Sequence, residues 1–497
     1  MDMEYLAAGP VGRARIRLLS GIRAFPRRVM GALCAIPRGI AAVGRGIGRF
    51  LLEMGLIFVR GDVSTKLSFF IMGLGCIRRG RIWRGLLYAG LQAAFWLFFL
   101  TAGMGQIAAL STLGTRVPEE VWNEERGIFE YTRGDNSMLV LLYGVVSLLI
   151  AVLYLVLYFG SIRVSYETEM MARDGRRVPG LREELSDLSG RSFHKTLLFL
   201  PVTAVLIFTV LPLLFMILIA FTNYDRFHMP PGNLFSWVGL DNFRAILGLG
   251  GNAHLGTTFR SILGWTLVWA FFATVTNYVL GMVLAILINR RGIRFKKFFR
   301  TVFVTTIAIP QFVSLMFMRN LLSETGLVNV FLTQMGWITE PIRFLTDGTI
   351  AKITVIAVNM WVGIPYSMLI TTGILMNIPD DLYEASRIDG ASPVMQFWKI
   401  TLPYVLFVTA PYLITQFVGN INNFNVIWLL SGGGPMTGEY YQAGKTDLLI
   451  TWLYRITTGE QNYKLASVIG IITFAVSAAF SLIVYSRTSS AKEGEFQ

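Results

Sequence analysis

Charge, cysteine and histidine are all scarce in this sequence of 497 residues. Only 15% of the residues are charged and 54% are hydrophobic, a balance too apolar for a soluble globular chain of this size. The two cysteines, Cys34 and Cys76, have no nearby His or Cys, which argues against a disulfide framework and against a metal site. No Ser-His-Asp or paired-carboxylate pattern stands out. The sequence therefore predicts a membrane protein that does no covalent chemistry and binds no metal or cofactor itself.

Eight apolar runs are long enough to cross a bilayer, which takes about 20 residues. They predict an all-α, polytopic membrane protein. The runs are Leu86–Leu110, Met138–Gly160, Thr196–Phe221, Ile262–Asn289, Thr301–Leu321, Ile350–Met376, Tyr404–Leu430 and Leu465–Tyr485. Their middles contain essentially no Asp, Glu, His, Lys or Arg, the groups that bind the coupling ion in ion-driven carriers. Energy for transport is therefore expected to come from another subunit.

The net charge of +14 is distributed unevenly between the loops. Of the 44 Lys and Arg residues, 32 lie in the two terminal segments and in the loops on the same side of the predicted spans. By the positive-inside rule this bias places both termini in the cytoplasm and the protein in the cytoplasmic membrane. The same distribution explains the basic charge without nucleic acid as a partner.

Residues 1–85 form a basic segment before the first span, for which we expect a cytoplasmic or interfacial location. Val11–Arg60 mixes Arg with Gly, Ala, Ile and Pro, which favours short basic helices lying on the anionic lipids of the inner leaflet, the alternative being a disordered basic tail. Ser68–Cys76 is apolar but too short to span, so we expect it at the interface. The segment lacks the pattern of a cleavable signal peptide.

The cytoplasmic loop at residues 377–403 has few basic residues, and its local signals predict two short helices. Asp380 can cap the first helix, and Gly390 can adopt the left-handed conformation that ends it. Three apolar residues recur along one face at helical spacing: Leu382, Ala385 and Ile388. Ser392 can cap a second helix that begins at Pro393. Such a helical pair suits a part that transmits force from a soluble partner, although an ordinary surface hairpin fits the same pattern.

This loop also matches a family signature in register, formed by Glu384, Ala385, Ser386, Gly390, Ile400, Leu402 and Pro403. The spacing resembles the "EAA" loop of bacterial ABC importer permeases. The resemblance implies a MetI-like permease core whose cytoplasmic coupling helix docks on an ATPase subunit, with Glu384 paired to a basic group there. Ser386 replaces the commoner second alanine, which exchanges one small residue for another.

From the third span to the C-terminus the chain is similar to MalF-type permeases of maltose and maltodextrin importers. The matching stretches are Val358–Tyr366, Asp380–Ser386, Lys399–Pro403, Asn422–Phe424, Gly433–Pro435 and Thr446–Leu449. The resemblance implies the importer transmembrane domain over residues 196–487. From the predicted spans and the loop charges we expect two accessory transmembrane helices and a cytoplasmic loop over residues 86–195, and a cytoplasmic tail over residues 488–497. The resemblance also implies four kinds of partner: a MalG-like second permease subunit, two ATPase subunits that bind ATP-Mg, an extracellular sugar-binding protein and an oligosaccharide.

Two predicted spans carry amides and small or aromatic residues at helical spacing: Asn359, Val362, Gly363 and Tyr366 in the sixth, and Gln416, Gly419, Asn420 and Asn423 in the seventh. Neutral amides can bond to hydroxyls without a buried charge, and aromatic faces pack against sugar rings. By itself the pattern fits amides that hold helices together at least as well. The resemblance implies instead that these positions line a sugar site halfway across the membrane.

Three departures from the family pattern bear on the substrate and on the binding protein. Gln416 stands where the family has a small hydroxyl residue, and Ile307 where it has an aromatic one. The outer loop over residues 222–261 is shorter than the folded loop domain of enteric relatives. The sequence thus predicts a non-enzymatic ABC permease subunit for maltose or maltodextrin. The alternatives are a permease for a galacto-oligosaccharide or raffinose-type sugar and, from other classes, an ion-coupled secondary sugar carrier or a membrane scaffold or sensor that transports nothing.

Overall fold

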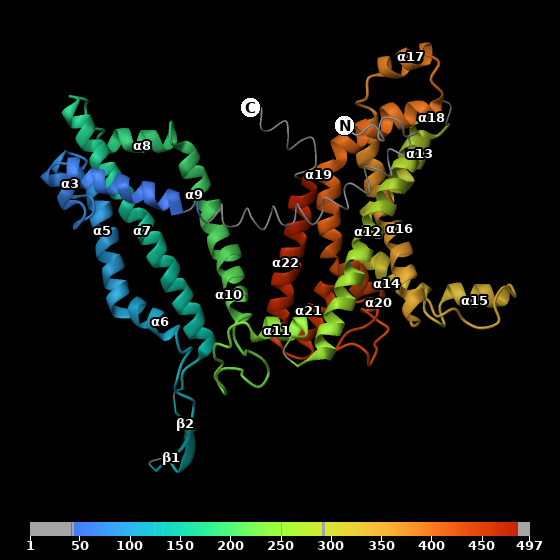
Figure 1. The fold of residues 1–497 in the computed structure, drawn as a ribbon, viewed down its shortest axis with the longest axis horizontal. Helices are drawn as coiled ribbons and strands as arrows, with labels where there is room; N and C mark the ends of the chain where they lie inside the picture. The colour runs from blue at the N-terminus through green and yellow to red at the C-terminus, as the bar shows by residue number, and fades with distance from the viewer. Residues whose placement is uncertain are drawn as a thin grey trace, which may run out of the picture. The chain divides into compact units, whose positions relative to one another are not determined.

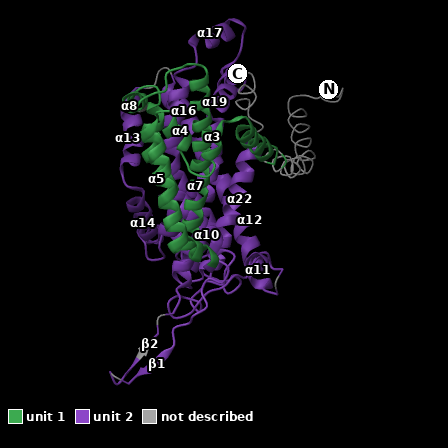
Figure 2. Cartoon of the chain, turned by 90° about the vertical axis from the view of Figure 1, so that its left-hand side faces the viewer, with its two compact units in different colours: residues 1–108, 143–207 green, residues 109–142, 208–497 purple. Residues whose placement is uncertain are grey.

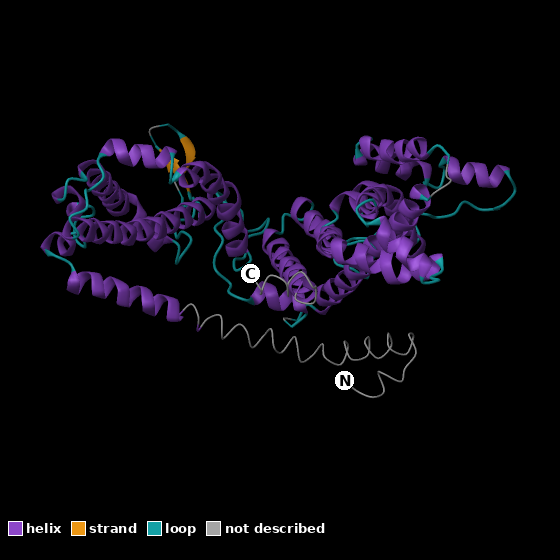
Figure 3. Ribbon diagram, turned by 90° about the horizontal axis from the view of Figure 1, so that it is seen from above, coloured by secondary structure: helices purple, strands orange, loops and turns teal. Residues whose placement is uncertain are grey.

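The computed structural model describes residues 41, 44–124, 126–132, 134–249, 251–290 and 294–485. Regular structure in this part of the chain is helical except for one short hairpin (Figure 3). Most of the predicted basic segment before residue 44, together with Cys34, lies outside the described residues, whereas residues 44–60 are helical. The chain divides into two compact units, residues 1–108 with 143–207 and residues 109–142 with 208–497 (Figure 2).

Unit 1 contains the first predicted spans and the segment before them. Its helices are α3 (Val63–Leu67), α4 (Leu74–Arg78), α5 (Ile82–Phe98), most of α6 (Met104–Ala109), most of α7 (Ser137–Arg173), α8 (Leu181–Ser189) and α9 (Phe193–Val205). A π-helical turn at Phe99–Gly103 joins α5 to α6. The connection that follows the second predicted span is largely helical, because α7 continues to Arg173 and α8 follows. Hydropathy marks only the apolar part of such a helix, and its polar end is stabilised by pairs such as Glu169 with Arg173.

A buried carboxylate ties the predicted interfacial segment to α7. Glu169 is only 2% exposed, and it accepts hydrogen bonds from the Thr65 hydroxyl at 2.6 Å and the Asp62 backbone N–H at 3.0 Å. The guanidinium of Arg79 lies 3.4 Å from the same carboxylate. A buried carboxylate is tolerated when charges and donors surround it in this way. The segment before α5 is thereby folded against α7.

Unit 2 contains the hairpin, formed by antiparallel strands β1 (Glu120–Asn123) and β2 (Ile128–Tyr131), and the remaining helices. These are α10 (Leu211–Ile219), α11 (Asp241–Leu247), α12 (Ala253–Asn289), α13 (Lys296–Ala308), α14 (Gln311–Leu321), α15 (Leu327–Gln334), α16 (Gly348–Leu375), α17 (Asp380–Ile388), α18 (Pro393–Gln396), α19 (Leu402–Ile421), α20 (Phe424–Ser431), α21 (Leu449–Thr458) and α22 (Tyr463–Tyr485). Within this unit α17 lies at one end of the long helices, and α11 and α15 lie at the other (Figure 1).

The core of unit 2 is built around the crossing of α12 and α16. The two helices can approach closely because Gly281 has no β-carbon. A β-carbon at this position would lie only 2.5 Å from the β-carbon of Ser367. Beside this crossing, Trp269 is fully buried and its indole N–H donates to the backbone oxygen of Asn420 in α19 at 3.1 Å. A second apolar cluster around Trp452 joins α11, α12, α21 and α22. The close approach at Gly281 and the hydrogen bond of Trp269 fix the relative positions of α12, α16 and α19.

Two predicted spans are broken in the structure. The fifth run bends by 91° between α13 and α14, at Pro310, whose missing N–H cannot continue the helix. The seventh run does not continue to Leu430, because its helix ends at Ile421 and Asn423 caps a separate helix, α20, by accepting from the Val426 N–H. In the described residues seven helices are long and apolar enough to span, and the bent pair brings the number to as many as eight.

Candidate functional site

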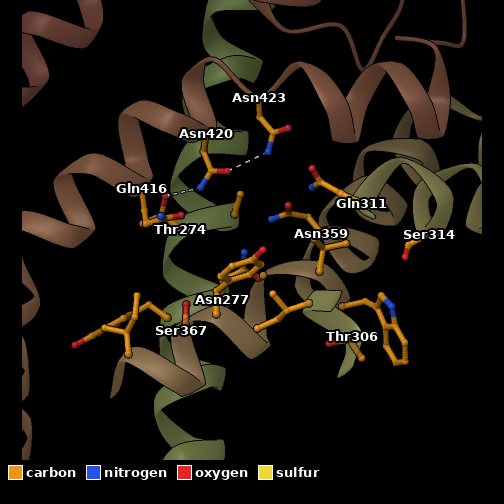
Figure 4. Close-up of a pocket in the computed structure, with 18 of the residues that line it drawn as sticks. Thr274, Asn277, Thr306, Gln311, Ser314, Asn359, Ser367, Gln416, Asn420 and Asn423 are labelled. Atoms are coloured by element: carbon orange, nitrogen blue, oxygen red, sulfur yellow. Dashed lines mark hydrogen bonds between the residues drawn. The ribbon is translucent and has the colours of Figure 1, made fainter. Parts of the chain in front are cut away.

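A cavity of about 550 Å³ lies among the helices of unit 2 (Figure 4). Its polar side chains come from α12, from the bend between α13 and α14, from α16 and α19, and from the cap of α20. They are Thr274, Asn277, Thr306, Gln311, Ser314, Asn359, Ser367, Gln416, Asn420 and Asn423. Four aromatic residues complete the polar lining: Tyr278, Trp361, Tyr366 and Tyr412. None of the described residues that line the cavity is Asp, Glu, Lys, Arg or His.

The amides at one side of the cavity are largely engaged with each other. The Asn420 side chain donates to the Thr274 hydroxyl at 3.0 Å and accepts from the Asn423 amide at 3.3 Å. The oxygen of Asn423 is taken up by the Val426 N–H at the start of α20. Asn420 and Asn423 therefore hold α12, α19 and α20 together, which is one of the two roles that the sequence left open for these amides. Both residues also face the cavity (Figure 4).

Asn277 and Asn359 differ from this pair. The side-chain oxygen of Asn277 and the side-chain nitrogen of Asn359 are buried and have no hydrogen-bond partner within the described structure. A buried amide atom that stays unpaired costs about 1–3 kcal/mol. Tyr366, two turns from Asn359 in α16, presents a half-exposed ring to the cavity. The cavity lining thus combines neutral hydrogen-bonding side chains with aromatic surface.

The structure brings together seven of the eight residues predicted for the membrane site. They are Asn359, Val362, Gly363, Tyr366, Gln416, Asn420 and Asn423. Gly419 lies in α19 but outside the lining, on the exposed side of the helix. The prediction did not include the residues of α12 or the polar residues at the bend, such as Gln311. The bend itself positions these last residues, since Pro310 turns the chain toward the cavity.

The loop at residues 377–403 forms the two helices that were expected, with two corrections. Asp380 is the first residue of α17 and not its cap, because Pro379 occupies the cap position. The second helix is not short, since α18 continues through a π-helical turn at Phe397–Thr401 into α19. Ser392 caps α18 by accepting from the Met395 N–H, and Gly390 has the left-handed φ of +77° that ends the first helix.

Side-chain hydrogen bonds hold α17 against α18 and the π-helical turn that follows it. The Tyr383 hydroxyl lies 2.8 Å from that of Thr401, and the Gln396 amide donates to the Ser386 hydroxyl at 2.8 Å. Ser386, the departure from the usual alanine, thus has a bonding role that alanine lacks. Ile400 and Leu402 pack into the apolar cluster beside Met282 of α12. Glu384, Ala385 and Pro403 are exposed, as is Ile388 at 86%.

A multi-pass helical protein with a neutral cavity among its spans and a rigid helical loop at one end has the architecture of a transporter's membrane subunit. Comparison with known proteins supports this. Residues 277–490 match the family described as binding-protein-dependent transport system inner membrane component. The permease GanP of the galactooligosaccharide transport system of Bacillus subtilis (strain 168) is 34% identical over 435 residues, which cover 87% of this chain and 99% of GanP. The maltodextrin permease MdxF of the same organism is 33% identical over 428 residues, which cover 84% of this chain and 94% of MdxF.

Among solved structures, a bacterial ABC transporter involved in the import of the acidic polysaccharide alginate has a similar fold. Its TM-score is 0.51, its identity is 22%, and the match covers 61% of this chain and 96% of that one. The chain therefore belongs to the family of binding-protein-dependent inner-membrane permeases, the membrane subunits of ABC importers. It is a multi-pass membrane protein.

Proposed function

We propose that this chain is one of two permease subunits of an ATP-driven importer and that a neutral oligosaccharide passes through the cavity among α12, α14, α16 and α19. The observation that carries the proposal is the lining itself: amides, hydroxyls and aromatic rings, with no Asp, Glu, His, Lys or Arg among the described residues. A sugar offers hydroxyls to the amides and apolar ring faces to the aromatics. The volume of the cavity also fits a small ligand, because ligand cavities commonly have about 300–1,000 Å³.

The absence of charge in the lining argues for an uncharged ligand. A carboxylate or ammonium group brought from water into this cavity would lose its hydration without gaining a counter-charge. Hydroxyls lose less, because neutral amides replace the hydrogen bonds of water. Maltose or a maltodextrin is the substrate that we propose first. A galacto-oligosaccharide is the alternative, because GanP and MdxF are almost equally similar to this chain.

Energy for transport is proposed to enter through α17. Its exposed apolar residues Leu382 and Ile388, beside exposed Glu384, would dock on one of two ATPase subunits that bind ATP-Mg. The coupling residues are proposed to be Glu384, Ala385, Ser386, Gly390, Ile400, Leu402 and Pro403. ATP binding would then favour one of two states of the membrane domain. A second permease subunit and an extracellular sugar-binding protein complete the assembly, and both termini would lie in the cytoplasm.

Replacing Tyr366 with alanine tests the proposed sugar path. Its ring lines the cavity, and its hydroxyl makes no hydrogen bond to another helix in the described structure. Replacing Asn420 would be less suitable, because it would also break the bond to Thr274. Loss of one aromatic contact of about 1 kcal/mol predicts a roughly fivefold lower kcat/KM for uptake of labelled maltotriose or galactotriose. The measurement uses the assembled importer in proteoliposomes, and co-purification of the ATPase subunit should not change.

The matched control is Ile353→Ala in the same helix, at an exposed position outside the cavity. It should transport as the unaltered protein does. If Tyr366→Ala and Ile353→Ala have the same uptake, the cavity is not the sugar path. Uptake by the isolated chain, driven by a proton gradient, would instead support a secondary carrier.

A further inference from the structure

The helix over residues 44–60, which precedes α3 in unit 1, has more apolar surface than its packing uses. Phe50, Met54 and Ile57 pack against α7. Six further apolar residues of the same helix are exposed: Ile47, Leu51, Leu52, Leu56, Phe58 and Val59. A contiguous exposed apolar surface of this kind marks a site of contact with a membrane or with another protein.

Arginines follow one side of the same helix. Arg45, Arg49 and Arg60 are exposed, and none of them has an ion-pair partner among the described residues. At 3.6 residues per turn the three positions lie along one side, and most of the exposed apolar residues lie between that side and the packed face. Arginine on the polar side and leucine or phenylalanine on the other is the pattern of a helix that lies in a membrane interface.

The helix meets α7 at the level where the apolar run of α7 ends. That run was predicted to end at Gly160, and the contacted residues lie on both sides of this position: Tyr158, Phe159, Ile162 and Tyr166. The rings of Phe50 and Phe159 are 4.9 Å apart, edge to face. One turn further along α7, the Arg163 guanidinium donates to the Glu53 carboxylate at 2.7 Å. Tyrosines and the first charges after an apolar run are typical of the boundary between hydrocarbon and headgroups.

The orientation of the helix also fits this boundary. In Figures 1 and 3 the helix, beside α3, runs across the long helices of unit 1 and not along them. Its C-terminal end is held in place, because the Asp62 backbone N–H donates to buried Glu169 of α7 at 3.0 Å. The helix therefore lies flat at one end of a spanning helix.

We propose that the helix over residues 44–60 is an in-plane membrane anchor that binds anionic lipids. Arg45, Arg49 and Arg60 bind the lipid phosphates, and exposed residues such as Leu52 and Val59 enter the acyl chains next to α7. Lipid is favoured over a protein partner because the arginines complement an anionic surface and the helix lies at the edge of a span. The anchor does not depend on which solute is transported.

Hydrogen–deuterium exchange of the full chain tests the anchor in two nanodiscs, one of phosphatidylcholine and one of equal parts phosphatidylcholine and phosphatidylglycerol. Each arginine near an anionic surface strengthens binding about fivefold, so three give at most about hundredfold. The backbone amides of residues 44–60 should exchange at least about tenfold more slowly in the anionic nanodisc. Molar salt should remove most of this difference, because it screens the charges. Exchange in the middle of α7 should be the same in both nanodiscs.

The variant combines Arg45→Gln, Arg49→Gln and Arg60→Gln, and it should lose the difference between the two nanodiscs. The matched control removes the same charge elsewhere, by replacing three other exposed arginines with glutamine: Arg116, Arg260 and Arg343. The control should keep the difference.

Three results would overturn the anchor. The first is equal exchange of residues 44–60 in the two nanodiscs for the unaltered protein, a measurement that needs no variant to fold. The second is an equal loss of the difference in both triple variants, which would show a response to net charge alone. The third is protection that appears only when another subunit is added, which would show that a protein covers the exposed face.

Discussion

Replacing Gly281 with alanine is expected to push α12 and α16 apart. The added β-carbon would lie 2.5 Å from the β-carbon of Ser367 and 2.8 Å from the backbone nitrogen of Met368, well inside contact distance. The backbone nitrogen cannot turn away as a flexible side chain would, so a helix must move. Overpacking of this kind costs about 1–3 kcal/mol. Because Ser367 lines the cavity, a shift of α16 would also change the shape of the proposed sugar path.

Gly264→Ala provides a control in the same helix. No atom lies within 4 Å of a β-carbon built at Gly264. Both substitutions gain about the same helix propensity, up to about 1 kcal/mol, so their difference isolates the packing cost. Thermal unfolding of the protein in lipid nanodiscs at one heating rate should give Gly281→Ala a midpoint a few degrees below that of Gly264→Ala. Equal midpoints would refute the close crossing of the two helices.

Two further predictions concern the ends of the molecule. Gly390→Val should reduce co-purification of the proposed ATPase subunit, because a β-branched residue at a φ of +77° is strained and would displace α17. Gly390→Asn should retain most of this co-purification, because asparagine tolerates the left-handed conformation. Burial alone would raise the pKa of the Asp225 carboxyl, but hydrogen bonds from Lys464 and His228 outweigh burial and lower this pKa from its ordinary value of 3.8. The ion-paired carboxylate therefore stabilises the fold above the unfolded pKa, and this stabilisation is lost as pH falls through the lower folded pKa. The midpoint difference between the unaltered protein and Asp225→Asn should accordingly shrink between pH 6 and pH 3, and a constant difference would contradict the pairing.

Hydropathy predicted where the helices lie more reliably than where they stop. Pro201, Pro365 and Pro411 all lie inside continuous helices, while Pro310 separates α13 from α14. Proline in a predicted span is therefore an ambiguous signal, because neighbouring helices can satisfy the backbone groups that it frees. The seventh predicted span extended too far because the mostly apolar stretch Phe424–Leu430 follows the end of α19 directly. The signal for a new helix there is the capping side chain of Asn423.

The site was predicted where polar residues repeat along one helix face, as in α16 and α19. The prediction did not include Asn277 and Gln311, although Thr274 and Ser314, one turn away in the same two helices, also line the cavity. Only the crossing of α12 with α16, and the bend at Pro310, bring them to the cavity. Sequence spacing describes one helix at a time, whereas this site is formed by residues from several.

Whether an asparagine holds helices together or binds a ligand depends on what its two amide atoms meet. Asn420 and Asn359 are both buried, and their spacing patterns gave them the same prediction. In the structure the Asn420 amide bonds to Thr274 and Asn423, whereas the nitrogen of Asn359 has no partner in the described residues. Of the two interpretations left open by the sequence, the bonding of helices to one another therefore accounts for Asn420, whereas it does not account for Asn359. The partners of the amide atoms separate the two residues, and these partners come from other helices, which the spacing along one helix does not show.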